Sequence, residues 1–256
     1  MMDWIQGERF VELANETNIY YRHTHDVNAF FKHLPTKDPF ILISHNSDGN
    51  VMNGIGRVED ANINLMPSNL KHWFGQNINV VNDRISSLPI GIENNAWCKK
   101  DQKKEKMIIM SKLSKQIKRI LYINHNVLTN PAQREKPYQL FQDEDWVTAV
   151  NGRHGYKFDE YLDNIHNHKF VLCPEGNGID THRTWECLYM GGIPIEKRNI
   201  NNQFYTDLPI CFVDDWEEIS EDFLIKEFIR IKTKNWNMKK LTFTYWKEKI
   251  LCQLES

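Results

Sequence analysis

One segment, residues 170–196, constrains this chain more than any other, because an apolar run, a glycine-rich loop, a helical pattern and a second apolar run follow one another there. The run 170–173 has the composition of a strand that is buried on both faces of a parallel sheet. The next pattern predicts a helix that begins at Asp180 or Thr181 and ends before Gly191. This order is typical of a doubly wound sheet, which binds ligands at the carboxyl ends of its strands.

The charged residues of the loop and the first helical turn indicate the chemistry of the ligand. They are Glu175, Asp180, His182, Arg183 and Glu186. The free N–H groups of a helix N-terminus, with Arg183 beside them, suit a phosphate group. A carboxylate one turn later, on Glu186, suits sugar hydroxyls. The segment therefore predicts a pocket for a nucleotide-sugar.

Bulk properties exclude several other classes of protein. The chain has 256 residues and a net charge of -2, which gives no electrostatic case for nucleic-acid binding. No apolar run approaches the ~18 residues of a membrane-spanning helix, and the N-terminal sequence lacks the pattern of a signal peptide. The five cysteines are scattered, which is typical of a reducing compartment, so we expect a cytoplasmic protein without a membrane span.

Strand and helix patterns alternate in both halves of the chain. Strands are expected at 40–43, 85–91, 120–123, 146–150, 170–173 and 209–213, and helices at 69–76, 158–166, 218–232 and 238–254. This alternation predicts an α/β protein with two small Rossmann-like, doubly wound domains that face a cleft. We expect an N-terminal domain over 1–105, a C-terminal domain over 106–235, and a final helix over 236–256 that packs back near the domain junction.

A basic segment separates the two halves. Between Lys99 and Arg119 there are nine Lys or Arg residues against two Asp or Glu residues. The simpler interpretation is a solvated helix face. The alternative is a connection between domains whose charge faces an anionic ligand.

With these elements placed, the stretch 174–186, followed by Gly192-Ile193-Pro194-Ile195, resembles the donor-site motif of exostosin-like glycosyltransferases. It is more distantly similar to α1,3-fucosyltransferases. Weaker similarity occurs over 122–134 and 73–91. The resemblance implies a GT-B fold, in which the C-terminal domain holds most of the nucleotide-sugar. It also implies a glycan acceptor and the inverting transfer of a sugar without a divalent cation.

Carried onto this sequence, the resemblance implies that Arg134 and Arg183 hold the donor diphosphate, that Glu186 accepts hydrogen bonds from the ribose, and that Glu175 contacts the donor sugar. The full set of expected donor-binding residues is Asn126, Arg134, Glu175, Gly176, Gly178, Asp180, Thr181, His182, Arg183 and Glu186. Alternatives remain open for several of these residues. Arg183 and Glu186 have the spacing of an i, i+3 ion pair on a helix surface. Asp180 could be a helix cap only, Asn126 a turn former, His182 a structural histidine and Arg134 a solvated helix residue.

An inverting transfer needs a base that takes the proton of the acceptor hydroxyl. The N-terminal half offers Asp48, Glu93 and His45, in that order of preference. A UDP-sugar is favoured as donor. The alternatives are a fucosyltransferase that uses GDP-fucose and a non-catalytic module that binds a nucleotide or a glycan. The paired histidines at 23 and 25 and at 166 and 168 have no adjacent third ligand, so we expect no metal site.

Overall fold

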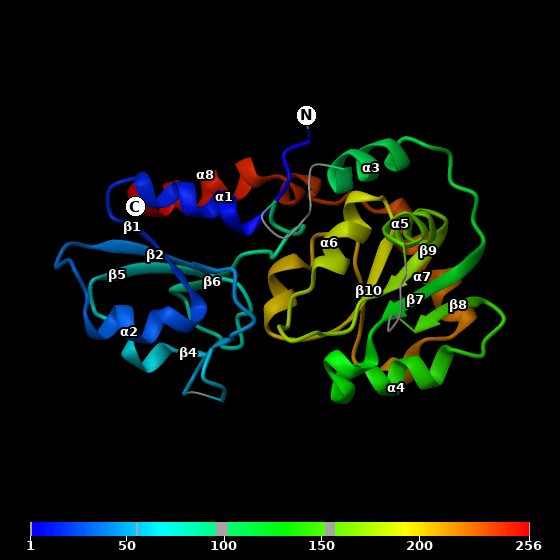
Figure 1. The fold of residues 1–256 in the computed structure, drawn as a ribbon, viewed down its shortest axis with the longest axis horizontal. Coiled ribbons are helices and arrows are strands. Elements are labelled where there is room, and N and C mark those ends of the chain that lie inside the picture. The colour runs from blue at the N-terminus through cyan, green and yellow to red at the C-terminus, as the bar shows by residue number, and fades with distance from the viewer. Residues whose placement is uncertain (1, 55, 96–101, 152–156, 256) are drawn as a thin grey trace.

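Two parallel β-sheets lie side by side, and helices cover both faces of each (Figure 1). This arrangement is seen in a computed structural model that describes residues 2–54, 56–95, 102–151 and 157–255. It confirms the predicted α/β class with two Rossmann-like units. We call the unit that is built on the first sheet the N-terminal lobe and the other the C-terminal lobe.

The N-terminal sheet has the strand order β1-β2-β5-β6, and all of its pairings are parallel. Its strands are β1 (Ile19–His23), β2 (Phe40–His45), β5 (Leu70–Gly75) and β6 (Ile85–Ser87), and a separate pair is formed by β3 (Val51–Met52) and β4 (Ala61–Asn62). Alternate residues face opposite sides. Ile41 and Ile43 pack toward α1 (Gly7–Val11), whereas Phe40 and Leu42 pack toward α2 (Val27–Lys32).

The helix expected over 69–76 is wrong, because this stretch forms β5, the third strand of the sheet. It lies between β2 and β6, so both of its faces are covered by protein. Leu70, Trp73 and Phe74 are all buried, but they contribute to two different cores. The i, i+3, i+4 spacing of these apolar residues imitates a helical face, although it arises here from a strand that is apolar on both sides.

The C-terminal sheet has the order β11-β10-β9-β7-β8, again with parallel pairings. Its strands are β7 (Arg119–His125), β8 (Val147–Asn151), β9 (His168–Leu172), β10 (Ile193–Lys197) and β11 (Cys211–Val213). The chain runs outward from β7 to β8, then crosses to β9 and continues to the opposite edge. The boundary between β7 and β9 is therefore the topological switch point of this sheet, where α/β proteins bind ligands.

Helices pack on both faces of the C-terminal sheet. They are α3 (Gln102–Ser111), α4 (Pro131–Phe141), α5 (Phe158–His166), α6 (His182–Tyr189) and α7 (Glu221–Thr233). One core joins α4 and α7 to the sheet through Leu121 and Phe170, and the other joins α3, α5 and α6 through Tyr122 and Val171. The predicted domain boundary at residues 105 and 106 falls inside α3, which packs on α5 and thus belongs to the C-terminal lobe.

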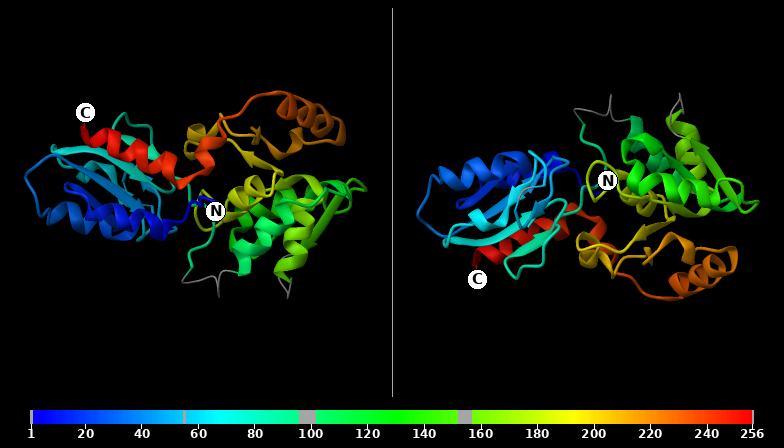
Figure 2. Two further views of the ribbon diagram at one scale, coloured as in Figure 1. Left: turned by 90° about the horizontal axis from the view of Figure 1, so that it is seen from above. Right: turned by 90° about the horizontal axis from the view of Figure 1, so that it is seen from below.

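The last helix, α8 (Phe243–Glu255), returns to the first lobe, as its red ribbon shows over the cyan strands in Figure 2. It contacts β2 and β5, and its Trp246 and Ile250 share a core with Ile43. The short 3₁₀ helix Met238–Leu241 before it contacts α6. The segment that leads into α8 thus contacts the C-terminal lobe, whereas the helix itself packs on the N-terminal sheet.

Candidate functional site

Two adjoining cavities lie where the carboxyl ends of the two sheets meet. The first, which we call the arginine cavity, has a volume of about 360 Å³ and lies mainly on the C-terminal lobe. Its lining residues are Asp48, Ile90, Lys103, Thr129, Arg134, Phe158, Tyr161, Gly176, Asn177, Gly178, Asp180, Thr181, His182, Arg183 and Glu186. The segments after β7 and β9 supply most of them, so this cavity occupies the switch point of the sheet.

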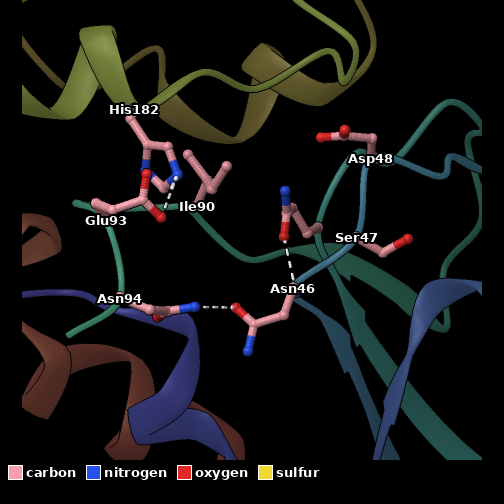
Figure 3. Close-up of a pocket in the computed structure, with 8 residues that line it drawn as sticks. Asn46, Ser47, Asp48, Ile90, Glu93, Asn94 and His182 are labelled. Atoms are coloured by element: carbon pink, nitrogen blue, oxygen red, sulfur yellow. Dashed lines mark hydrogen bonds and ion pairs between the residues drawn. The ribbon is translucent and has the colours of Figure 1, made fainter. Parts of the chain in front are cut away.

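The second cavity, which we call the amide cavity, has a volume of about 340 Å³ and lies against the N-terminal lobe (Figure 3). Asn46, Ser47, Asp48, Gln76, Ile90, Glu93, Asn94 and His182 line it. Four of these eight side chains are neutral amides or hydroxyls that donate and accept hydrogen bonds. Asp48, Ile90 and His182 line both cavities, so these residues mark the junction between the two.

Arg134 is fixed in the wall of the arginine cavity by backbone carbonyl groups. The guanidinium donates from Nε to the carbonyl of Glu175 at 2.8 Å and from Nη1 to the carbonyl of Asn126 at 3.1 Å. These two carbonyls belong to the loops after β9 and β7, so the arginine ties the two sides of the switch point together. A Cβ on Gly176 would lie 2.8 Å from Nη2, which explains the glycine at this position.

Arg183, in the first turn of α6, faces the same space. Its Nε is buried and has no hydrogen-bond partner among the described residues, and the same holds for Oγ1 of Thr181, the N-cap residue of α6. Burial and the nearby charge of Arg183 lower the pKa of Arg134 to about 10, so both guanidinium groups are charged at neutral pH. Two cations and an unsatisfied hydroxyl therefore converge on the N-terminus of a helix.

Neither arginine forms an ion pair with a carboxylate in the part of the chain that the structure describes. The i, i+3 pairing of Arg183 with Glu186 is thus absent there. Glu186 instead accepts a hydrogen bond from the Tyr161 hydroxyl at 2.5 Å and lies 3.4 Å from Nζ of Lys103. Arg134 is buried and Arg183 is half-buried, and Glu186 attracts Arg183 only from beyond ion-pair distance. The two guanidinium groups together therefore favour an additional anion in this cavity.

The structure brings most of the predicted donor-binding residues together. The side chains of three of them, however, form hydrogen bonds within the protein. Asp180 lines the arginine cavity, yet its carboxylate accepts hydrogen bonds from the backbone N–H of Ile90 and from Trp185 Nε1. Both oxygens are thus occupied by protein donors, one from each lobe. Burial raises the pKa of this carboxyl group to about 6. The carboxylate of Asp180 therefore joins the two lobes and has no oxygen left over for a ligand.

Glu175 and Asn126 lie behind the cavity wall. The Glu175 carboxylate accepts a hydrogen bond from Asn199 Nδ2 at 3.0 Å, and burial raises its pKa. Asn126 Oδ1 accepts from the backbone N–H of Leu128, which is the turn-forming alternative for this residue. Both contribute to the site through their carbonyl groups, which hold Arg134, so the predicted sugar contact of Glu175 is not supported by this geometry.

Gly178 lies close to the N-terminal lobe. A Cβ at this position would lie 2.6 Å from Nδ2 of Asn77, which itself adopts a left-handed conformation with φ of 57°. The Oδ1 atom of Asn77 accepts the backbone N–H of Asp180 at 2.9 Å. Gly178 therefore permits a tight contact between lobes at the edge of the arginine cavity.

The prediction that His45 is a candidate for the general base is wrong. His45 is the last residue of β2 rather than part of a loop, and its side chain is fully buried. Its Nδ1 accepts the backbone N–H of Asn46, so its Nε2 donates to the carbonyl of Pro89 at 3.0 Å. Burial lowers its pKa to about 4, and it lines neither cavity. Asp48 and Glu93 both reach a cavity and stay candidates.

Glu93 points toward His182 across the amide cavity (Figure 3). Its Oε1 lies 3.7 Å from His182 Nε2, and the other ring nitrogen, Nδ1, lies 2.8 Å from the carbonyl oxygen of Gly91. His182 is the first residue of α6, and it enters the junction of the two cavities from the C-terminal lobe.

Sequence reasoning missed Lys103, Phe158 and Tyr161, which line the arginine cavity from α3 and α5. Lys103 Nζ lies 4.7 Å from the centroid of the Phe158 ring. The basic composition of the segment 99–119 was the available signal, and Lys103 supports the interpretation in which its charge faces a ligand. The first residues of that segment lie outside the described ranges.

Metal ligands do not gather at this site. Among the described residues, no three His, Cys, Asp or Glu side chains lie close enough together to hold an ion. The sequence has an Asp-x-Asp triplet, Asp143-Glu144-Asp145, but these exposed residues precede β8 at the amino edge of the sheet, opposite the cavities. No helix within the described ranges is both long and apolar enough to cross a lipid bilayer.

Comparison with solved structures shows a likeness in fold. A solved structure described as "Crystal Structure of alpha1,3-Fucosyltransferase" aligns with 99% of this chain and 87% of its own, at 15% sequence identity and a TM-score of 0.46. No protein-family model matches the chain, and no curated protein matches its sequence. The resemblance to exostosin-like enzymes therefore stays a prediction.

Proposed function

We propose that this protein is a glycosyltransferase of GT-B arrangement, which moves a sugar from a nucleoside diphosphate sugar to a hydroxyl group of a glycan with inversion. The observation that carries the proposal is the pair of guanidinium groups, Arg134 and Arg183, at the switch point, which form no direct ion pair with a carboxylate of the described residues. The negative charge of a diphosphate would balance the positive charge of these two groups. A planar guanidinium group can also donate to two phosphate oxygens at once.

The rest of the arginine cavity suits the other parts of such a donor. Thr181 Oγ1 and the N-terminus of α6 add donors for phosphate oxygens. The rings of Phe158 and Tyr161 offer surfaces against which a nucleobase can stack. Glu186, which is 5% exposed and held by Tyr161, presents a carboxylate for ribose hydroxyls.

The mechanism that we propose relies on fixed positive charge. When the bond between the sugar and the diphosphate breaks, negative charge develops on the leaving phosphate oxygen, and Arg134 and Arg183 stabilise it without having to move. This arrangement does what a divalent cation does in other transferases, so we propose that no metal is needed. The amide cavity next to it, with its amide, hydroxyl and carboxylate side chains, suits the hydroxyl-rich surface of a glycan acceptor.

A donor panel tests the proposal. The protein is incubated with UDP-glucose, UDP-galactose, UDP-N-acetylglucosamine and GDP-fucose, with and without mixed oligosaccharide acceptors and in the presence of EDTA, and free UDP or GDP is measured. We expect release from one donor, a UDP-sugar being favoured over GDP-fucose. Binding of UDP or GDP without release from any donor would instead indicate a non-catalytic binding module.

A further inference from the structure

The base that accepts the proton of the glycan hydroxyl must lie where the two cavities meet. With the donor in the arginine cavity and the acceptor in the amide cavity, as the proposed function has it, the reacting carbon and the acceptor oxygen come together there. Three residues line both cavities, and Ile90 has no proton-accepting group. The choice at the junction is therefore between Asp48 and His182, whereas Glu93 lines the amide cavity alone.

The ring of His182 is held in one orientation by the N-terminal lobe. A carbonyl oxygen only accepts hydrogen bonds, so the 2.8 Å contact with Gly91 requires the proton on Nδ1. In the neutral ring, Nε2 then carries the lone pair. This atom faces the cavity, and the side chain is 31% exposed, so a hydroxyl group can reach it.

Glu93 is suitably placed to stabilise the ring after it has gained a proton. Its Oε1 lies 3.7 Å from Nε2, which is too far for a direct hydrogen bond but close enough for charge attraction. Among the described residues no group forms a hydrogen bond with Nε2, so this atom is free to accept one from a hydroxyl group. The loop that carries Glu93 is held in turn, because its carbonyl accepts Gln6 Nε2 at 2.7 Å. Asp48 has no comparable partner for its carboxylate among the described residues, and it is exposed.

We propose that His182 on the donor-binding helix, rather than a carboxylate of the N-terminal lobe, is the general base, with Glu93 as the positioning residue that stabilises its imidazolium form. This assignment rests on the proposed function. The acceptor O–H proton moves to Nε2 while the acceptor oxygen forms its bond to the anomeric carbon. The bond from that carbon to the phosphate oxygen breaks, and its electron pair leaves with the diphosphate. The imidazolium then loses its proton to water.

Four variants test this assignment: H182A, E93Q, D48N and H33A. His33 is an exposed histidine after α2, so H33A is the matched control. For each variant, turnover of the donor that the wild type uses is measured as release of free nucleoside diphosphate, and the affinity for UDP and GDP is measured by calorimetry. General-base catalysis contributes about 100- to 10,000-fold to a rate. We expect H182A to lose that factor in kcat, with an unchanged Kd for the nucleotide.

Two further readouts separate a base from a structural residue. Imidazole added to H182A fits the vacated space and should restore turnover, whereas it should not restore E93Q. E93Q should lower kcat about tenfold without changing the Kd for the nucleotide, because a charge partner contributes less than the base itself. H33A should match the wild type in every measurement.

Other outcomes overturn the assignment in distinguishable ways. A larger loss for E93Q or D48N than for H182A assigns the base to that carboxylate. If the loss of turnover in H182A is no larger than its loss of affinity for the nucleotide, His182 is a phosphate ligand only. If the wild type turns over no donor, the proposed function itself is wrong and this assignment falls with it.

Discussion

The backbone N–H of Ile90 donates to Asp180 Oδ2 at 2.7 Å, and this bond joins the loop after β6 to the loop before α6. The second oxygen of the same carboxylate accepts Trp185 Nε1 at 2.9 Å. One buried carboxylate thus fixes the position of the glycine loop relative to the N-terminal lobe. The two cavities are shaped by this contact, since Ile90 and Asp180 both line the arginine cavity.

D180N tests the structural role of this carboxylate. The amide NH₂ of asparagine would face either Ile90 N–H or Trp185 Nε1–H, which are both donors, so one of them loses its acceptor. Leaving a buried donor unsatisfied costs about 1–3 kcal/mol. We expect that loss in urea unfolding of D180N, and no comparable loss for the exposed control D38N. Equal stability of the two variants would show that the contact contributes little.

The carboxyl group of Glu196 predicts a pH dependence of stability. Burial raises its pKa to about 7, with Thr184 and Asn202 donating to it. An acid with a raised pKa in the folded state stabilises the fold while it is protonated, and this contribution is lost as the pH rises through the folded pKa. The free energy of unfolding of the wild type should therefore fall relative to that of E196Q between pH 4.5 and about pH 7, and the difference should then level off. A constant difference across this range would contradict the raised pKa.

The two loop glycines should fail in different ways when they are replaced by alanine. In G176A the new Cβ presses on Arg134 Nη2, which makes neither of the two hydrogen bonds that hold this guanidinium group, so we expect about tenfold weaker UDP binding with little change in stability. In G178A the Cβ meets the fixed Asn77 amide between the lobes, so we expect a loss of stability of about 1–3 kcal/mol. Calorimetry and urea unfolding of both variants measure the contrast, and identical behaviour would contradict it.

The placement of α8 predicts a large effect at Trp246. This side chain is 1% exposed and belongs to the core that α8 shares with β2 and β5. W246A should destabilise the protein by about 3–5 kcal/mol, the usual range for removing a buried aromatic side chain, whereas K247A on the same helix should have little effect. A small loss for W246A would mean that α8 is not part of the core of the N-terminal lobe.

The sequence predicted the C-terminal lobe better than the N-terminal one, for physical reasons. Residues 170–196 hold a strand, a loop, a helix and a strand in one uninterrupted stretch, and local patterns suffice there. The strand β5 was mistaken for a helix, because a strand that is apolar on both faces carries no alternation. The buried position of His45 was missed because it depends on Phe10 and Pro89, which are distant in the sequence.

In the candidate site, too, local sequence patterns predict some residues, whereas contacts between distant segments decide the others. Arg134, Arg183 and Glu186 could be predicted because each stands at the carboxyl end of a strand or in the helix that follows. The carbonyl contacts of Glu175 and Asn126 could not, because they arise only when the loops after β7 and β9 come together around Arg134. Lys103 and Tyr161 enter from helices whose packing decides which of their faces meets the cavity.

The central claim is that Arg134 and Arg183 together bind a nucleoside diphosphate. Calorimetric titration of UDP and GDP into the wild type, R134A, R183A and the double variant tests it most directly, with R230A on the exposed face of α7 as the matched control. Each charged hydrogen-bond donor is worth about 1.5–3 kcal/mol. We predict that the double variant binds the preferred nucleotide at least about 100-fold more weakly than the wild type and R230A do. Unchanged affinity in the double variant, or no binding of either nucleotide by the wild type, would contradict the claim.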